Sequence, residues 1–168
     1  MRAIAVITEV ELPDKFGEDL AGLFFGEIAV SVIKGEVAEK RAALNVARGQ
    51  LRADVLFELL SVMPRFHKTV YIIDGDAYVP GLNFVFGVAA DDKALVFTER
   101  LRSRDPAVFY LRLLKEVAHE LGHAFGLPHC PNPRCVMSFS NTLADTDYKG
   151  PGFCPQCAAR LRKTLGGK

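Results

Sequence analysis

Three histidines in the C-terminal third of the sequence have the residue type and spacing of metal ligands. The stretch "HELGHAFGLPH" places His119, His123 and His129 around Glu120 and Gly126. Two histidines one helical turn apart can reach one ion, and the glutamate between them points to the rim of the same cleft. Because Gly126 can adopt a positive φ, it can end the helix and return the third histidine to the ion. We therefore predict a catalytic zinc held by His119, His123 and His129, with Glu120 as the base that activates a zinc-bound water.

Other residues could supply the third ligand. One class of HExxH enzymes uses a glutamate on a later helix, but this sequence contains no glutamate after Glu120. Another class uses a downstream aspartate, for which Asp145 and Asp147 could stand, although solvated aspartates are the commoner interpretation of such a turn-like stretch. His129 fits better, because the full spacing HExxHxxGxxH supplies the ligands, the base and the turn together. His67 stands alone before a predicted strand, and we assign it no function.

Four cysteines follow the histidines as two close pairs. Cys130 and Cys135 are spaced Cx4C, and Cys154 and Cys157 are spaced Cx2C. This layout is typical of a tetrahedral structural zinc with four thiolate ligands, whereas two disulfides are the alternative and are rare in the cytosol. Adjacent residues of an extended segment point in opposite directions, so His129 and Cys130 can serve two different ions. The second zinc would then brace the loop that carries the third histidine.

The composition excludes some functions and predicts a location. The formal net charge of +1 provides no basic surface of the kind that nucleic-acid binding requires. No apolar run approaches the roughly 18 residues that span a bilayer. The opening "MRAIAVITEV" is typical of a first strand and not of a secretory signal. We therefore predict a cytoplasmic protein without a nucleic-acid or membrane partner.

Apolar patterns predict the elements that position these residues. Strands are predicted at 3–10, 29–34, 68–74, 83–90 and 93–100, the last two as an antiparallel hairpin. Helices are predicted at 14–26 and at 48–63, where Pro64 stops the second. The longest predicted helix begins with Asp105 as its N-cap and Pro106 as its first residue, and it continues to Gly126.

The longest predicted helix is apolar except along one stripe. Its polar residues share a face because they are three or four positions apart; they are Arg112, Glu116, His119, Glu120 and His123. A helix that is apolar nearly all round is buried, so this stripe should look into a cleft. The following thirty or so residues are rich in Pro, Gly, Asn and Asp, and we expect little regular structure there.

The combined motif HExxHxxGxxHCx4CxM followed by CxxC closely resembles the archaemetzincins, a metzincin family defined by this signature. The resemblance is strongest over 119–157, and "DAYVPGLNFVFGVA" is also similar to the family's central region. It implies that Met137 lies in a tight turn beneath the metal. Phe139 stands where some relatives carry a tyrosine ligand, so that role is not carried over. Sixteen residues separate Met137 from Cys154, one fewer than in the family pattern.

The resemblance implies a fold class of α/β (α+β): one compact metzincin-like catalytic domain over 1–168, with an upper part at about 1–126 and a lower part at about 127–168. It implies a twisted mixed sheet, a backing helix, an active-site helix, a loop-rich lower half held by the structural zinc and a short C-terminal helix. The implied activity is that of a zinc metalloprotease whose peptide or protein substrate lies along 84–90. We expect the protein to be a monomer that binds two Zn²⁺ ions, one catalytic and one structural. The alternative is a non-catalytic, zinc-stabilised peptide-binding module.

Overall fold

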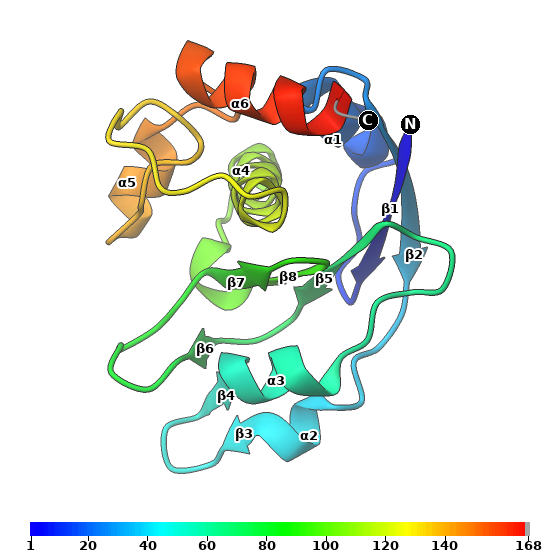
Figure 1. Ribbon diagram of the computed structural model, residues 1–168. Helices are drawn as coiled ribbons and strands as arrows, with labels where there is room; N and C mark the ends of the chain where they lie inside the picture. Colours follow the sequence, from blue (N-terminus) through cyan, green and yellow to red (C-terminus); the bar gives the residue numbers. More distant parts are fainter. Residues whose placement is uncertain (167–168) are drawn as a thin grey trace.

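A mixed five-stranded sheet forms the centre of the computed structural model, which describes residues 1–166 (Figure 1). The strand order is β2-β1-β5-β8-β7. The parallel strands are β1 (Arg2–Thr8), β2 (Ile28–Lys34), β5 (Lys68–Ile73) and β8 (Lys93–Phe97). β7 (Gly87–Ala90) runs antiparallel to β8 and is the last strand of the sheet. The mixed α/β class is confirmed. Of the predicted edge strand at 84–90, only 87–90 is a strand of this sheet.

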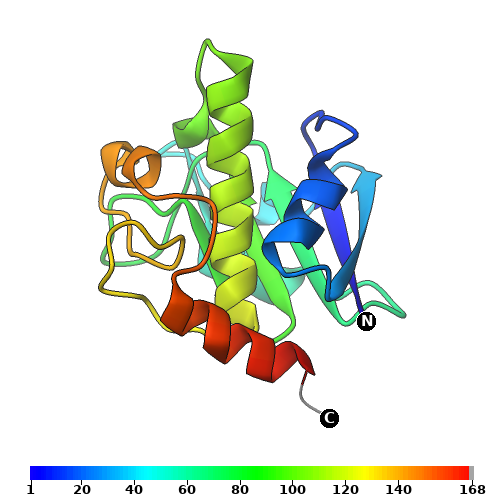
Figure 2. The same cartoon turned by 90° about the horizontal axis from the view of Figure 1, so that it is seen from above.

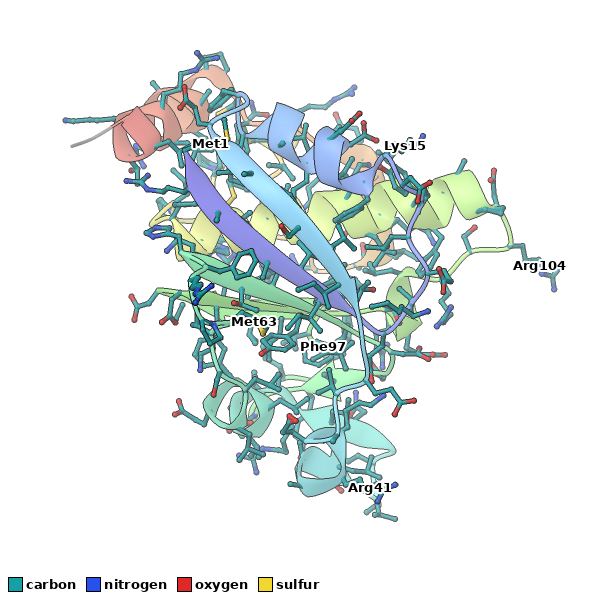
Figure 3. The ribbon with its side chains drawn as sticks, turned by 90° about the vertical axis from the view of Figure 1, so that its right-hand side faces the viewer. Met1, Lys15, Arg41, Met63, Phe97 and Arg104 are labelled. Carbon is teal, nitrogen blue, oxygen red and sulfur yellow. The ribbon has the colours of Figure 1, made fainter. Side chains whose placement is uncertain are left out.

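A smaller layer covers one face of this sheet. It contains the helices α2 (Lys40–Ala43) and α3 (Ala53–Leu59) and a sheet of β3 (Leu44–Asn45), β4 (Gln50–Arg52) and β6 (Ala77–Tyr78). Leu51 and Leu56 from this layer are buried together with Phe97 of the main sheet. Figure 3 shows Phe97 between the strands and these helices. The sequence patterns did not predict this second sheet.

The opposite face of the sheet carries the longest helix. The layer contains α1 (Phe16–Leu23), α4 (Pro106–Ala124), α5 (Leu143–Tyr148) and α6 (Pro155–Gly166). α4 begins as predicted, because the Asp105 side chain accepts a hydrogen bond from the backbone N–H of Ala107 and Pro106 is the first helical residue. In Figure 2, α6 crosses the C-terminal end of α4, while α5 and α1 lie on either side of it. The predicted C-terminal helix is confirmed.

The predicted helix over 48–63 is wrong in its extent. Gly49 has a φ of +67°, and Leu51 pairs with Leu44 in the small sheet, so the helix begins only at Ala53. The predicted apolar stripe is also displaced, since Leu56 is fully buried whereas Leu59 is 46% exposed.

The long loop after α4 contains more regular structure than we expected. α5 forms within it because the Thr142 hydroxyl and the Asp145 carboxylate make reciprocal hydrogen bonds at its first turn. None of the helices in residues 1–166 combines the length and the apolar character that crossing a bilayer requires.

Candidate metal centres and catalytic cleft

The three histidines that the sequence singled out lie together near the C-terminal end of α4. His119 and His123 are one turn apart on the helix. His129 returns from the segment after Gly126, whose φ of +96° ends the helix. One ring nitrogen of each histidine lies within 4.8 Å of those of the other two. The structure therefore brings the three imidazoles together, whereas their role as ligands stays a prediction.

Backbone carbonyl groups fix the tautomers of the first two histidines. The Nδ1 atom of His119 lies 2.7 Å from the carbonyl oxygen of Val136, and Nδ1 of His123 lies 2.7 Å from that of Leu127. Because a carbonyl oxygen can only accept, each Nδ1 donates its proton and each Nε2 keeps a lone pair. Burial lowers the pKa of His123 and lowers that of His119 well below its ordinary value. Both rings are therefore neutral, as a metal ligand must be.

The two Nε2 atoms converge at the separation that a shared cation requires. They lie 3.1 Å apart, and two nitrogens bound to one tetrahedral zinc at about 2.1 Å would lie roughly 3.4 Å apart. Two lone pairs at this distance repel each other unless a cation lies between them. Neutral imidazoles are common zinc ligands, so the donor set of His119, His123 and His129 fits a catalytic zinc with room for a water.

Glu120 lies beside the histidines in a cleft of about 480 Å³. Its Oε1 atom is 3.9 Å from Nε2 of His119, and its side chain is buried. Burial raises the pKa of Glu120 well above its ordinary value, and the charge of Glu116 raises it further. β7 forms the opposite wall, where a Cβ atom added to Gly87 would stand 2.7 Å from Cγ of Glu120. A glycine at this position therefore leaves room for the candidate base.

Met137 packs against α4 between the two histidines of the helix. Its side chain is fully buried, and a Cβ atom added to Gly122 would stand 2.6 Å from its Sδ atom. The Cys130 backbone N–H donates to the Met137 carbonyl oxygen at 2.9 Å, which fixes the turn. Phe139 lies outside the cluster, with its ring centroid 5.1 Å from that of His129. It forms an apolar wall beside the third histidine.

The four cysteines form a second cluster. All four are free thiols, and their four Sγ atoms lie within 4.8 Å of one another. The Sγ atoms of Cys130 and Cys154 are 3.7 Å apart, while sulfurs bound to one tetrahedral zinc at about 2.3 Å would lie roughly 3.8 Å apart. A hydrogen bond from the Cys157 backbone lowers the pKa of Cys154 to about 7. The arrangement fits a four-thiolate zinc and not two disulfides.

The adjacent residues His129 and Cys130 belong to different clusters. The histidine joins the group on α4, and the cysteine joins the thiol group. One peptide unit therefore links the two candidate metal sites, as the sequence predicts.

The other residues that we weighed as ligands lie elsewhere. The Asp145 carboxylate accepts a hydrogen bond from the Thr142 backbone N–H at 3.2 Å and so caps α5. Asp147 forms an ion pair with Arg112 at 2.8 Å. The His67 ring stacks on Phe125, with 6.0 Å between centroids. None of these three side chains belongs to the histidine cluster found in the described residues.

The polar face of α4 meets two different neighbours, so the expectation that all of it faces a cleft is wrong for Arg112. That arginine pairs with α5, whereas Glu116 lines the cleft together with Lys149. Sequence reasoning missed Lys149. The available signal was the buried glutamate on α4, because a buried charge needs a partner.

This fold, with two histidines on α4, a third after Gly126 and a buried methionine beside them, is that of the metzincin class of zinc metallopeptidases. The sequence profile of Peptidase family M54 matches residues 27–163, and the chain belongs to that family. The expected activity class, a zinc metalloprotease, follows from this membership.

Individual relatives agree with this assignment. The archaemetzincin of Pyrobaculum aerophilum is 52% identical over 124 residues, which cover 73% of this chain and 77% of that protein. The crystal structure of archaemetzincin from Methanopyrus kandleri superposes with a TM-score of 0.87 at 35% identity, covering 98% of this chain and 96% of that one. The archaemetzincin of Archaeoglobus fulgidus, crystallised with malonate, gives a TM-score of 0.79 at 31% identity, covering 94% and 99%.

Proposed function

We propose that the cleft hydrolyses peptide bonds, with His119, His123 and His129 holding a catalytic zinc and Glu120 acting as the general base. The observation that carries this proposal is the 3.1 Å approach of the two Nε2 lone pairs, each fixed by a carbonyl group behind its ring. When bound, a zinc ion supplies Lewis acidity, which lowers the pKa of a coordinated water to about 7 and polarises a carbonyl oxygen.

Glu120 is placed to move the proton in this reaction. Its carboxylate is 3.9 Å from Nε2 of His119, so it reaches the space that the histidines enclose. In hydrolysis it takes a proton from the attacking water and passes that proton to the leaving amine. The wall formed by Gly87 and the burial of Glu120 keep bulk water away from the carboxylate.

The substrate is proposed to pair with β7. β7 is the edge strand on the cleft side of the sheet, and its residues Gly87, Val88 and Ala89 line the cleft. A peptide added as a further antiparallel strand would satisfy the free backbone groups of this edge. Its scissile carbonyl would then lie over the histidines.

A second, structural zinc is proposed at the four cysteines. Such a site contributes roughly 10 kcal/mol or more of folding free energy, which the loop between α4 and α6 cannot obtain from burial alone. We propose that it braces His129 through Cys130, and Met137 through the hydrogen bond from the Cys130 backbone N–H. Replacing Cys154 and Cys157 by serine should therefore lower zinc affinity at the histidines and lower activity. Unchanged zinc affinity and activity would contradict the bracing role.

Metal counting combined with peptide cleavage tests the proposed chemistry. We expect two zinc ions per chain and cleavage of a peptide library by the wild type. Glu120→Gln keeps the shape of the side chain and removes the base, so cleavage should fall by several orders of magnitude while the zinc content stays at two. Glu120→Ala should behave in the same way. If the wild type binds two zinc ions and peptides but cleaves none, the chain is a binding module and the catalytic proposal is wrong.

The organisation of the chain is also a proposal. We propose that residues 1–126 and the lower part from 127 onward form one catalytic domain, which a single cooperative unfolding transition would support and two separate transitions would contradict. The monomeric state and the cytoplasmic location stay predictions from the sequence; light scattering on the purified protein tests the first.

A further inference from the structure

The cleft extends beyond the histidines to a pair of buried charges that the proposed chemistry does not use. Glu116 lies one turn before Glu120 on α4, and Lys149 follows α5. Both line the cleft, and each is only 2% exposed. Figure 2 shows that α5, which leads into Lys149, lies alongside α4. Burying two charges is costly, so their position in a cleft of ligand size suggests a role in binding.

The two charged groups do not satisfy each other. The Nζ atom of Lys149 is 3.7 Å from Oε1 of Glu116, which is too far for a good hydrogen bond. Oε1 also accepts a bond of 3.3 Å from the Thr146 hydroxyl. Lys149 donates to the Ser138 carbonyl oxygen at 3.0 Å. The Nζ atom of Lys149 also lies 3.5 Å from Nδ1 of His119. That nitrogen is protonated and donates to the Val136 carbonyl oxygen, so it cannot accept a hydrogen bond from the lysine.

Two residues that line the cleft therefore have spare hydrogen-bonding capacity. An ammonium group has three donors, and the Ser138 carbonyl is the one short acceptor that Lys149 has among the described residues. Both contacts of Glu116 use Oε1. Ser140 also lines the cleft, but its hydroxyl is buried and has no hydrogen-bond partner within residues 1–166. A ligand group placed between Glu116 and Lys149 would meet a donor and an acceptor.

The pair lies on the side of the cleft that receives the part of the substrate following the scissile bond. The first residue of β7, Gly87, packs on Glu120. Glu116 and then Arg112 lie on α4 in the direction of its N-terminus from Glu120. The Arg112 side chain donates to the Leu101 carbonyl oxygen, so this end of α4 lies near the end of β8. Because β7 is antiparallel to β8, this is the end where β7 begins. A peptide antiparallel to β7 passes this end after its scissile bond.

We propose that Glu116 and Lys149 form a specificity subsite that selects a carboxamide side chain, glutamine or asparagine, immediately after the scissile bond. The inference rests on the proposed function for the position of that bond. The lysine donates to the amide oxygen, and the glutamate accepts from the amide nitrogen. A charged side chain would add an unpaired charge to a pair that is already neutral, and an apolar one would remove water from both groups without replacing its hydrogen bonds.

Methionine is the matched comparison for glutamine, because it has a similar length and volume and lacks the amide. A site that hydrogen-bonds a substrate group discriminates strongly against an analogue without it. We expect kcat/KM for peptides with glutamine after the scissile bond to exceed that for methionine by at least about tenfold.

The double variant Glu116→Leu with Lys149→Met tests the subsite. Removing both charges together leaves no unpaired buried charge, so this variant should fold where Lys149→Met alone would leave Glu116 unpaired. Zinc content and the unfolding midpoint check that it does. The double variant should cleave the methionine peptide at least as well as the glutamine peptide. An unchanged preference for glutamine would overturn the proposal, and so would a wild type that prefers methionine.

Binding without turnover separates this inference from the proposed catalysis. Peptide hydroxamates with a glutamine or a methionine side chain would be held in register by the zinc, and calorimetry gives their Kd values. The wild type should bind the glutamine compound about tenfold more tightly, and the double variant should not. If that holds while no peptide is cleaved, catalysis alone is wrong. If cleavage depends on Glu120 but neither assay favours glutamine, the subsite alone is wrong. If neither compound binds the zinc-loaded protein, both are wrong.

Discussion

Replacing Gly122 by alanine should create a steric clash with Met137, which packs on α4 between His119 and His123. Gly122 lies in α4 between His119 and His123, and a Cβ atom at this position would stand 2.6 Å from Sδ of Met137 and 3.3 Å from the ring of Phe153. Real Cβ atoms do not approach sulfur so closely. Met137 is fully buried, so it has no solvent space into which to move.

A second helical glycine allows the size of this effect to be isolated. Gly22 lies in α1, where an added Cβ atom would have nothing within 4 Å. Gly→Ala in a helix interior stabilises by up to about 1 kcal/mol through propensity alone. Overpacking a tight core costs about 1–3 kcal/mol. Because both variants share the propensity gain, Gly122→Ala should be less stable than Gly22→Ala by about 1–3 kcal/mol.

Urea unfolding at a fixed free zinc concentration measures this difference, because bound metal shifts apparent stability. Gly122→Ala should also lose zinc from the histidine site faster than the wild type, since Met137 and Val136 are neighbours and the Val136 carbonyl orients His119. If the free energies of unfolding of the two alanine variants agree to within about 0.5 kcal/mol, the packing of Met137 on α4 is not as the structure shows.

Three further changes act on other parts of the site. A Cβ atom added to Gly87 would stand 2.6 Å from the Leu95 carbonyl oxygen on β8 and 2.7 Å from Cγ of Glu120, so Gly87→Ala should shift β7 and displace the Glu120 side chain. We expect kcat, measured on protein with two zinc ions bound per chain, to fall by up to about a hundredfold; an unchanged kcat would contradict this. Gly126→Ala meets open space but keeps a φ of +96°, so backbone strain should cost about 1–3 kcal/mol and lower zinc occupancy at the histidines. A hydrogen bond from Arg112 lowers the pKa of Asp147. Its contribution, at most about 1 kcal/mol for a carboxylate that is 44% exposed, is therefore present above the unfolded pKa of about 3.9 and is lost as pH falls through the folded value. Asp147→Asn should lower stability at pH 7 and make no difference at pH 2; equal stability at pH 7 would contradict this.

The candidate histidine site could be predicted because its spacing is local. His119 and His123 are fixed by one turn of a helix whose cap, Asp105 and Pro106, is visible in the sequence. Gly126 marks the end of that helix and the turn that returns His129. The three histidines lie within eleven consecutive residues, so the period of the helix and the conformational range of glycine are sufficient to predict their approach.

The parts that the sequence did not predict depend on distant partners. Leu51 belongs to a strand because it pairs with Leu44 and Ala77, and nothing in its own neighbourhood shows that pairing. Periodicity over 48–63 therefore produced one long helix. Lys149 presents the same difficulty, because its hydrogen-bond acceptor, the Ser138 carbonyl, and its ion-pair partner, Glu116, both lie on other segments. The residues around Lys149 in the sequence are those of an ordinary polar loop.

Different turns of α4 position different parts of the cleft. Its earlier turns hold α5, because Arg112 pairs with Asp147, and Lys115 donates to the Thr146 carbonyl oxygen at 3.0 Å. Its later turns carry the histidines and Glu120. Lys149 leaves α5 directly, so the anchoring of α5 sets where this lysine enters the cleft. The proposed metal ligands are positioned by α4 and its following turn, whereas the end of the cleft that holds Lys149 is positioned by α5. If Glu116 and Lys149 form the proposed subsite, substitutions in α5 should change substrate selectivity without changing the arrangement of His119 and His123 on α4.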